Sequence, residues 1–176
     1  MVPEAPLEIV ENGLAPNGEG WFVLAARDAQ WYASELGFYT QFERAGSRFS
    51  QIGIGLGMLR PGEPSAMYHG EDAQEDFLVL SGECLLIIEG EERRLRAWDF
   101  VHCPNWTEHI FVGAGDGPCL VLGVGARRAG RGLVFPVNEA AIRHGAGVEE
   151  ETSDPKVAYA RFGEDVPVPC PPEFAG

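Results

Sequence analysis

Two histidines and two glutamates in the middle of the chain are residue types that bind metal ions. His69, Glu71 and Glu75 lie close together in the sequence, and His109 follows further along the chain. Imidazole nitrogens and carboxylate oxygens are ligands for first-row transition metals. The four residues therefore predict one site for a single divalent ion of iron, manganese, nickel or zinc.

The spacing of these residues suits a site built on β-strands. His69 and Glu71 are two residues apart, so their side chains point to the same side of an extended strand. The subset His69, Glu75 and His109 makes a two-histidine, one-carboxylate face with open positions for a further ligand. Glu71 has three readings at this point: a fourth ligand, a base beside the metal, or a solvated carboxylate.

The segment that holds these residues resembles the two motifs of the cupin superfamily, in register over roughly residues 55 to 125. The stretch PGEPSAMYHGEDAQEDFLVLSG matches the first motif through Pro61, Gly62, His69, Glu75 and Gly82. The stretch WDFVHCPNWTEHIFVG matches the second motif through Asp99, Pro104 and His109. The segment also looks like small stand-alone bacterial cupins of the conserved-barrel type, a likeness that implies no substrate.

Four positions depart from the motifs. Glu71 stands where the family has a second histidine, which makes the site more anionic and favours manganese or iron over copper. Trp98 and Trp106 stand at two glycine positions, and Gly113 replaces an asparagine. Because tryptophan lacks the backbone freedom of glycine, we expect the two tryptophans to cap the barrel or to press on its outer layer.

The resemblance implies an all-β fold, the double-stranded β-helix or jelly-roll barrel, and the residue pattern agrees. Short apolar runs separated by turn residues, without helices between them, are typical of such a barrel. Helix-start and helix-stop signals predict short C-terminal helices at 137–144 and 155–161. The strands are expected at 21–24, 38–39, 52–56, 76–80, 83–88, 93–96, 99–103, 108–112 and 118–124.

The composition along the chain predicts three parts. Residues 1–20, rich in Pro, Gly and Glu, are expected to form an N-terminal arm, and residues 21–132 the barrel domain. Residues 133–176 are expected to form a helical extension that packs on the barrel, with a loosely held proline-rich tail at 167–172.

Alternation along the strands predicts which side chains share the pocket. Four apolar residues are expected to form its walls: Met67, Phe77, Val79 and Phe111. Leu78 and Leu80 then point to the other face of their strand, and a strand that is apolar on both faces is normally covered on both. The cover is the N-terminal strands, the C-terminal helices or a second subunit, and a homodimer is favoured because closed two-fold oligomers are common.

The composition excludes several classes of protein. The chain has 176 residues, 45% of them apolar, which is typical of one globular domain. A net charge of −14 argues against binding to nucleic acid or to an anionic membrane, since either needs a basic face. There is no signal-peptide pattern and no apolar run long enough to span a membrane. The four cysteines lack C-x-x-C spacing, so a reducing cytoplasm is expected.

Three functions are compatible with the sequence. The first is a small metal-dependent enzyme of the oxygenase or isomerase type that acts on a small organic substrate in the barrel, with the ion as Lewis acid. The second is a non-catalytic module that binds or senses a small ligand. The third is a metal-free structural barrel. The fold alone does not choose among them, so whether the chain is an enzyme stays open at this point.

Overall fold

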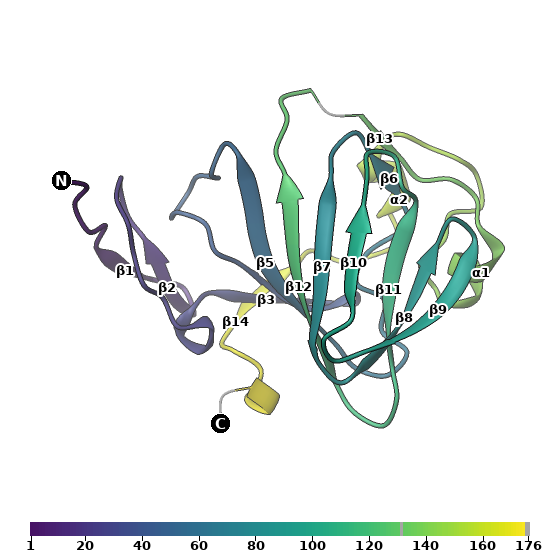
Figure 1. Ribbon diagram of the computed structural model, residues 1–176, viewed down its shortest axis with the longest axis horizontal. Coiled ribbons are helices and arrows are strands. Elements are labelled where there is room, and N and C mark those ends of the chain that lie inside the picture. The colour runs from purple at the N-terminus through teal and green to yellow at the C-terminus, as the bar shows by residue number, and fades with distance from the viewer. Residues whose placement is uncertain (131, 175–176) are drawn as a thin grey trace.

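The computed structural model describes residues 1–130 and 132–174, and its architecture is dominated by antiparallel strands (Figure 1). The larger sheet contains β3 (Trp31–Ser34), β4 (Gly37–Gln41), β5 (Ile52–Leu59), β7 (Glu75–Ser81), β10 (Phe100–Cys103), β12 (Cys119–Ala126) and β14 (Val166–Val168). Its strand order is β10-β7-β12-β5-β4-β3-β14. The smaller sheet has the order β11-β8-β9 and contains β8 (Glu83–Ile88), β9 (Glu91–Arg96) and β11 (His109–Ala114).

Shorter elements complete the fold. A hairpin of β1 (Leu7–Val10) and β2 (Gly13–Pro16) lies beside the barrel at the left of Figure 1. The two-residue strands β6 (Gly70–Glu71) and β13 (Leu133–Val134) pair with each other. The helices are α1 (Glu139–Arg143) and α2 (Pro155–Ala158), with short 3-10 turns at Ala26–Asp28 and Pro172–Phe174.

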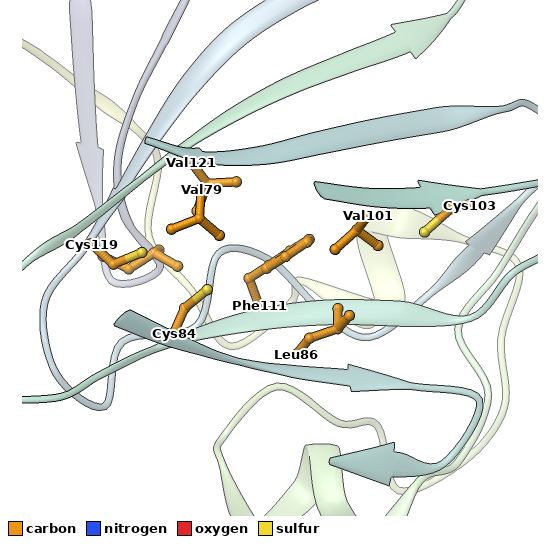
Figure 2. Close-up of a cluster of buried hydrophobic side chains, with 9 residues drawn as sticks. Val79, Cys84, Leu86, Val101, Cys103, Phe111, Cys119 and Val121 are labelled. Atoms are coloured by element: carbon orange, nitrogen blue, oxygen red, sulfur yellow. The ribbon is translucent and has the colours of Figure 1, made fainter. Parts of the chain in front are cut away.

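The two sheets face each other across an apolar core, which Figure 2 shows in close-up. Strand alternation sends Val79 and Val121 inward from the larger sheet and Leu86 and Phe111 inward from the smaller one. This arrangement of short antiparallel strands around one interior is the double-stranded β-helix that the sequence predicts. The core closes one end of the barrel and leaves the other end free to form a cavity.

Most of the predicted strands and both helices are confirmed. The six strands expected between residues 76 and 124 are present as β7 to β12. Asn138 caps α1 by accepting a hydrogen bond from the backbone N–H of Ala141, and Asp154 caps α2 in the same way through Lys156. Gly145 follows α1 with φ of +72°, as its role at the helix end requires. The predicted boundaries are within a few residues of those observed.

Two predictions about the ends of the chain are wrong. The run 21–24 is not a strand, because Trp21 makes only an isolated bridge to Glu4. The tail is not loosely held, because β14 pairs with β3 and Glu173 forms an ion pair with Arg60 at 3.1 Å. Residues 131, 175 and 176, which belong to the predicted barrel and extension, lie outside the described residues.

The chain covers part of the outer face of its own larger sheet. The C-terminal residues Val168, Cys170 and Phe174 pack against a cluster built around Trp31 and Met58. Further along the sheet the same face is open: the side chains of Trp98 and Phe100 are 75% and 64% exposed. This chain therefore covers only part of the outer apolar face of β7.

The two tryptophans at the family's glycine positions adopt the backbone conformation of the residue they replace. Trp98 has φ of +75° and Trp106 has φ of +67°, in the left-handed region that bulky residues rarely enter. Trp98 does not cap the barrel, since its side chain is exposed, whereas Trp106 lies against the backbone of Gly132. Both turns keep the left-handed backbone geometry, so the two tryptophans are held at strained φ values. This corrects the expectation that the two tryptophans cap the barrel or press on its outer layer.

Candidate metal centre

Backbone pairing brings the two histidines side by side. His69 lies just before β6 and His109 begins β11, and the two residues form an antiparallel bridge. The amide of His109 donates to the carbonyl of His69 at 2.9 Å, and the reverse hydrogen bond measures 3.3 Å. Their rings are 5.4 Å apart between centroids. Residues forty positions apart in the sequence thus present two imidazoles to one side of the fold.

The two glutamates approach the same point from other strands. Glu71 on β6 is buried, and Glu75 begins β7, where it faces the interior. Ligand atoms of His69, Glu71 and Glu75 all lie within 4.8 Å of one another. The Nε2 atom of His109 lies 3.6 Å from Oε2 of Glu75. The structure therefore brings all four predicted ligands to one place.

Hydrogen bonds to backbone carbonyls orient both imidazoles. Nδ1 of His69 lies 2.7 Å from the carbonyl oxygen of Met67, and Nδ1 of His109 lies 3.0 Å from that of Thr107. A carbonyl only accepts, so each Nδ1 carries the proton and donates it. The lone pair of each ring is then on Nε2. A carbonyl that fixes the tautomer in this way is the usual support for a histidine that binds a metal.

The environment of His109 also favours the form that binds a metal. Burial lowers the pKa of His109 below its ordinary value, against the opposing effects of the Thr107 carbonyl and the Glu71 charge. The imidazole is therefore neutral at physiological pH, and only neutral imidazole offers a lone pair to a metal.

The donor set fits one divalent transition-metal ion. Ions of this kind hold nitrogen and oxygen ligands at about 2.0–2.2 Å, so the ligand atoms around one ion are roughly 3 to 4 Å apart. The 3.6 Å separation of His109 and Glu75 falls in that range. Two neutral imidazoles and two carboxylates would balance the charge of the ion, with His69, Glu71, Glu75 and His109 as the residues that hold it.

A cavity of about 490 Å³ opens beside the candidate ligands. His69, Glu75 and His109 line one side of it, together with the rings of Phe77 and Phe111. Beyond Glu75 and Phe77 the same sheet continues with five glycines that also line the cavity, which we call the glycine wall: Gly53, Gly55 and Gly57 on β5, and Gly123 and Gly125 on β12. The cavity is large enough for a small organic molecule.

Strand register explains how the glycine wall lies beside Glu75 on the same face of the sheet. Glu75 on β7 pairs with Gly125 on β12, which pairs in turn with Gly53 on β5. Phe77 is aligned in the same way with Gly123 and Gly55. Residues that are directly opposite on neighbouring strands point to the same face. Glycine therefore takes the place of larger residues at five cavity-lining positions on the two strands that follow β7 in the sheet.

The four residues predicted to form the pocket walls divide into two pairs. Phe77 and Phe111 line the cavity. Val79 lies two residues further along β7 and packs in the closed core between the sheets. Met67 packs beneath the C-terminal segment, against Phe135 and Ala158. The structure therefore places Met67 and Val79 away from the cavity lining.

The sequence interpretation missed the glycine wall. The signal was present as the alternation of glycine with large apolar residues over Ile52–Leu59, but it was used only to predict a strand. His102 of β10 lies on the outer face of the larger sheet, with its Nδ1 2.6 Å from Oδ1 of Asp76. Its side chain is exposed and it takes no part in the candidate site.

Comparison with known proteins supports the same family. Residues 55–125 match the family model of the cupin domain, and the double-stranded β-helix built around this segment agrees with that match. No match was found among curated proteins.

Three solved structures are among the similar ones. A sugar phosphate isomerase of the cupin superfamily from Silicibacter pomeroyi is 20% identical, with a TM-score of 0.55 and coverage of 88% of this chain and 99% of that one. A candidate sugar phosphate isomerase from Acidithiobacillus ferrooxidans is 25% identical, with a TM-score of 0.48 and coverage of 55% and 64%, so the chain spans less than two thirds of it. A polyketide cyclase from Streptomyces resistomycificus is 13% identical, with a TM-score of 0.47 and coverage of 70% and 75%.

The helices were also compared with the requirements of a membrane span. Within the described part of the chain, none of them has both the length and the apolar character needed to cross a bilayer.

Proposed function

We propose that this protein is a small metal-dependent cupin enzyme of the isomerase or oxygenase type, acting on a small organic substrate in the barrel cavity. One observation carries the proposal: two imidazoles that are oriented through Nδ1 by backbone carbonyls converge with two carboxylates at the side of a cavity. When bound, the ion would supply Lewis acidity toward substrate oxygens.

The residues of the chain have distinct parts in this proposal. His69, Glu75 and His109 hold the ion, and the rings of Phe77 and Phe111 exclude water from the reacting side of the cavity. Glu71 is buried next to this group, where a carboxylate accepts or returns a proton if the metal does not fully engage it. The Silicibacter pomeroyi protein with the same fold is named a sugar phosphate isomerase, which makes isomer interconversion the first reaction to test.

Elemental analysis tests the site. Protein purified without an affinity tag or added metal should contain close to one equivalent of iron, manganese, nickel or zinc, and the His69→Ala variant should lose it. Circular dichroism of the variant checks that the barrel stays folded. Absence of metal from both proteins, with reconstitution failing as well, would overturn the enzyme proposal.

The second candidate function is non-catalytic binding of a small ligand at the same site. The cavity and the cluster serve this role equally well, so the two are separated by turnover. Isomer interconversion or oxygen uptake by the metal-loaded protein supports the enzyme, whereas tight binding without turnover supports the binding module.

We also propose that the protein is a homodimer in the cytoplasm. The exposed side chains of Trp98 and Phe100 extend the outer apolar face of the larger sheet, and burial of such a face is a common basis of two-fold association. All four cysteines are free thiols, as expected in a reducing compartment. Sedimentation analysis of the protein and of a Phe100→Glu variant tests the dimer, since the charge should shift it to monomer.

A further inference from the structure

We propose that the substrate is an organic anion, whose phosphate or carboxylate group binds on the β5 side of the cavity through Arg127 and Arg48. This inference rests on the proposed function, because it places the rest of the substrate at the candidate metal ligands. It goes further by naming a charge that the substrate must carry and the residues that recognise it.

The guanidinium of Arg127 lies directly over the glycine wall. A methyl group added at Gly53 would come within 2.6 Å of Nη2 and 2.9 Å of Nε of Arg127. The absence of a side chain at Gly53 therefore makes room for this guanidinium on the cavity side of the sheet. Glu43 forms an ion pair with Nη2 and holds the group in place. Arginine has five N–H donors, so this one ion pair leaves others available for an anion.

Arg48 adds a charge that is not compensated locally. It lies in the loop between β4 and β5 and lines the same cavity. Among the described residues, no ion pair or hydrogen bond of its side chain is found. Arg127 and Arg128 line the same cavity, but Glu43 pairs with Arg127 and Asp72 pairs with Arg128. The guanidinium of Arg48 is therefore the charge that attracts a small anion to this side of the cavity.

The distance between the two ends of the site sets the size of the ligand. Gly53 is two strands away from Glu75 in register, which corresponds to about 10 Å at the usual spacing of strands. A molecule that reaches from the metal ligands to Arg127 therefore has oxygens at one end and an anionic group a few bonds away at the other. The lack of side chains at Gly125 and Gly53 makes room for Glu75 and for Arg127, which mark the two ends of this span.

Relaxation of ³¹P in inorganic phosphate, added to protein loaded with Mn²⁺, tests the inference. The paramagnetic effect falls steeply with distance, so it separates phosphate on the arginines from phosphate on the metal. We expect a metal–phosphorus distance of about 10 Å. We expect phosphate to bind about tenfold or more weakly in Arg127→Ala and in Arg48→Ala, because each loses a charge-assisted hydrogen bond.

Two further variants make the test specific. Arg94→Ala removes an exposed arginine of β9 outside the cavity and should leave phosphate binding unchanged. Gly53→Ala keeps every arginine but pushes a methyl group against the Arg127 guanidinium, so it should weaken binding. Acetate enriched in ¹³C, measured in the same series, shows whether carboxylate or phosphate depends more strongly on the arginines.

The outcomes separate this inference from the proposed function. Equal phosphate and acetate affinity in the wild type and in Arg127→Ala, no binding of either anion, or anion only in direct contact with Mn²⁺ would overturn the anion site. If the protein binds none of Mn²⁺, Fe²⁺, Ni²⁺ and Zn²⁺, the proposed function fails by that measurement. The ³¹P line width measured with the metal-free protein then still reports phosphate binding. Loss of this phosphate binding in Arg127→Ala supports the anion site, and unchanged phosphate binding in the variant overturns the anion site.

Discussion

The two faces of β5 and β12 are built from opposite kinds of residue. On the outer face β5 presents Ile54, Leu56 and Met58, of which Met58 is fully buried against the C-terminal segment. On the inner face the same strand presents only glycine until it reaches the closed core. Each glycine costs roughly 0.5–1 kcal/mol relative to alanine in a strand. Packing on the outer face therefore holds these strands in place, so the inner face can line a cavity.

The largest effect should come from the polar side of the cavity. His109→Ala removes a buried candidate ligand and should weaken metal binding by more than the roughly 10- to 100-fold typical of losing a mere supporting residue. His102→Ala, on the outer face of the larger sheet, is the matched control and should keep its metal. Metal content by elemental analysis measures both, and full stoichiometry in His109→Ala would remove His109 from the site.

The outer face should carry most of the stability of β5. Met58→Ala leaves a void in a fully buried position and should lower the free energy of unfolding by about 3 kcal/mol. Urea denaturation measures the change, while metal content should stay at the wild-type level. A loss below about 1 kcal/mol would show that the outer cluster does not hold the strand.

Glu71→Gln tests the one acidic position where the motif has histidine. The substitution keeps the size of a buried side chain but removes its charge, so we expect metal affinity to fall about tenfold without being abolished. Competition with a metal chelator measures the affinity. An unchanged value would mean that Glu71 does not contact the ion.

The smallest expected effect is a gain in stability, from a substitution in the glycine wall. A Cβ added at Gly57 has no atom within 4 Å, so Gly57→Val fills space and should raise the free energy of unfolding by roughly 0.5–1 kcal/mol. The added side chain would narrow the cavity while leaving the metal bound.

Gly55→Val, on the same face of β5, is the variant to compare with Gly57→Val. Its Cβ would lie 2.6 Å from the carbonyl oxygen of Thr40, so this variant should be destabilised. Thermal unfolding of the two proteins decides whether the glycine wall is kept for its open space or for its backbone contacts, and equal destabilisation in both would favour the second reading.

The strands and the candidate ligand residues were accessible from the sequence because both depend on local signals. Turn residues separate β7 to β12, and the spacing around His69 and His109 follows a known pattern. The glycine wall was not accessible in the same way. Glycine marks the lack of a side chain, and only the register with Glu75 and Phe77 reveals that the empty face is the one beside the site.

The positions predicted wrongly depend on tertiary contacts. Trp98 and Trp106 hold positive φ values that their own preference opposes, because the turns around them demand it. The proline-rich tail has no strand pattern of its own, yet Val166–Val168 pairs with β3. Pairing with β3, a strand distant in the sequence, therefore stabilises a segment whose local sequence does not favour a strand.

The composition of β14 has a consequence for aggregation. It is the last strand of the larger sheet, and an exposed edge strand normally offers free N–H and C=O groups to another chain. Pro167, opposite Tyr32, has no N–H to offer, and Pro169 follows directly after the strand. A chain with proline at its outermost strand makes a poor template for sheet extension, so this end of the sheet resists the growth of β-aggregates.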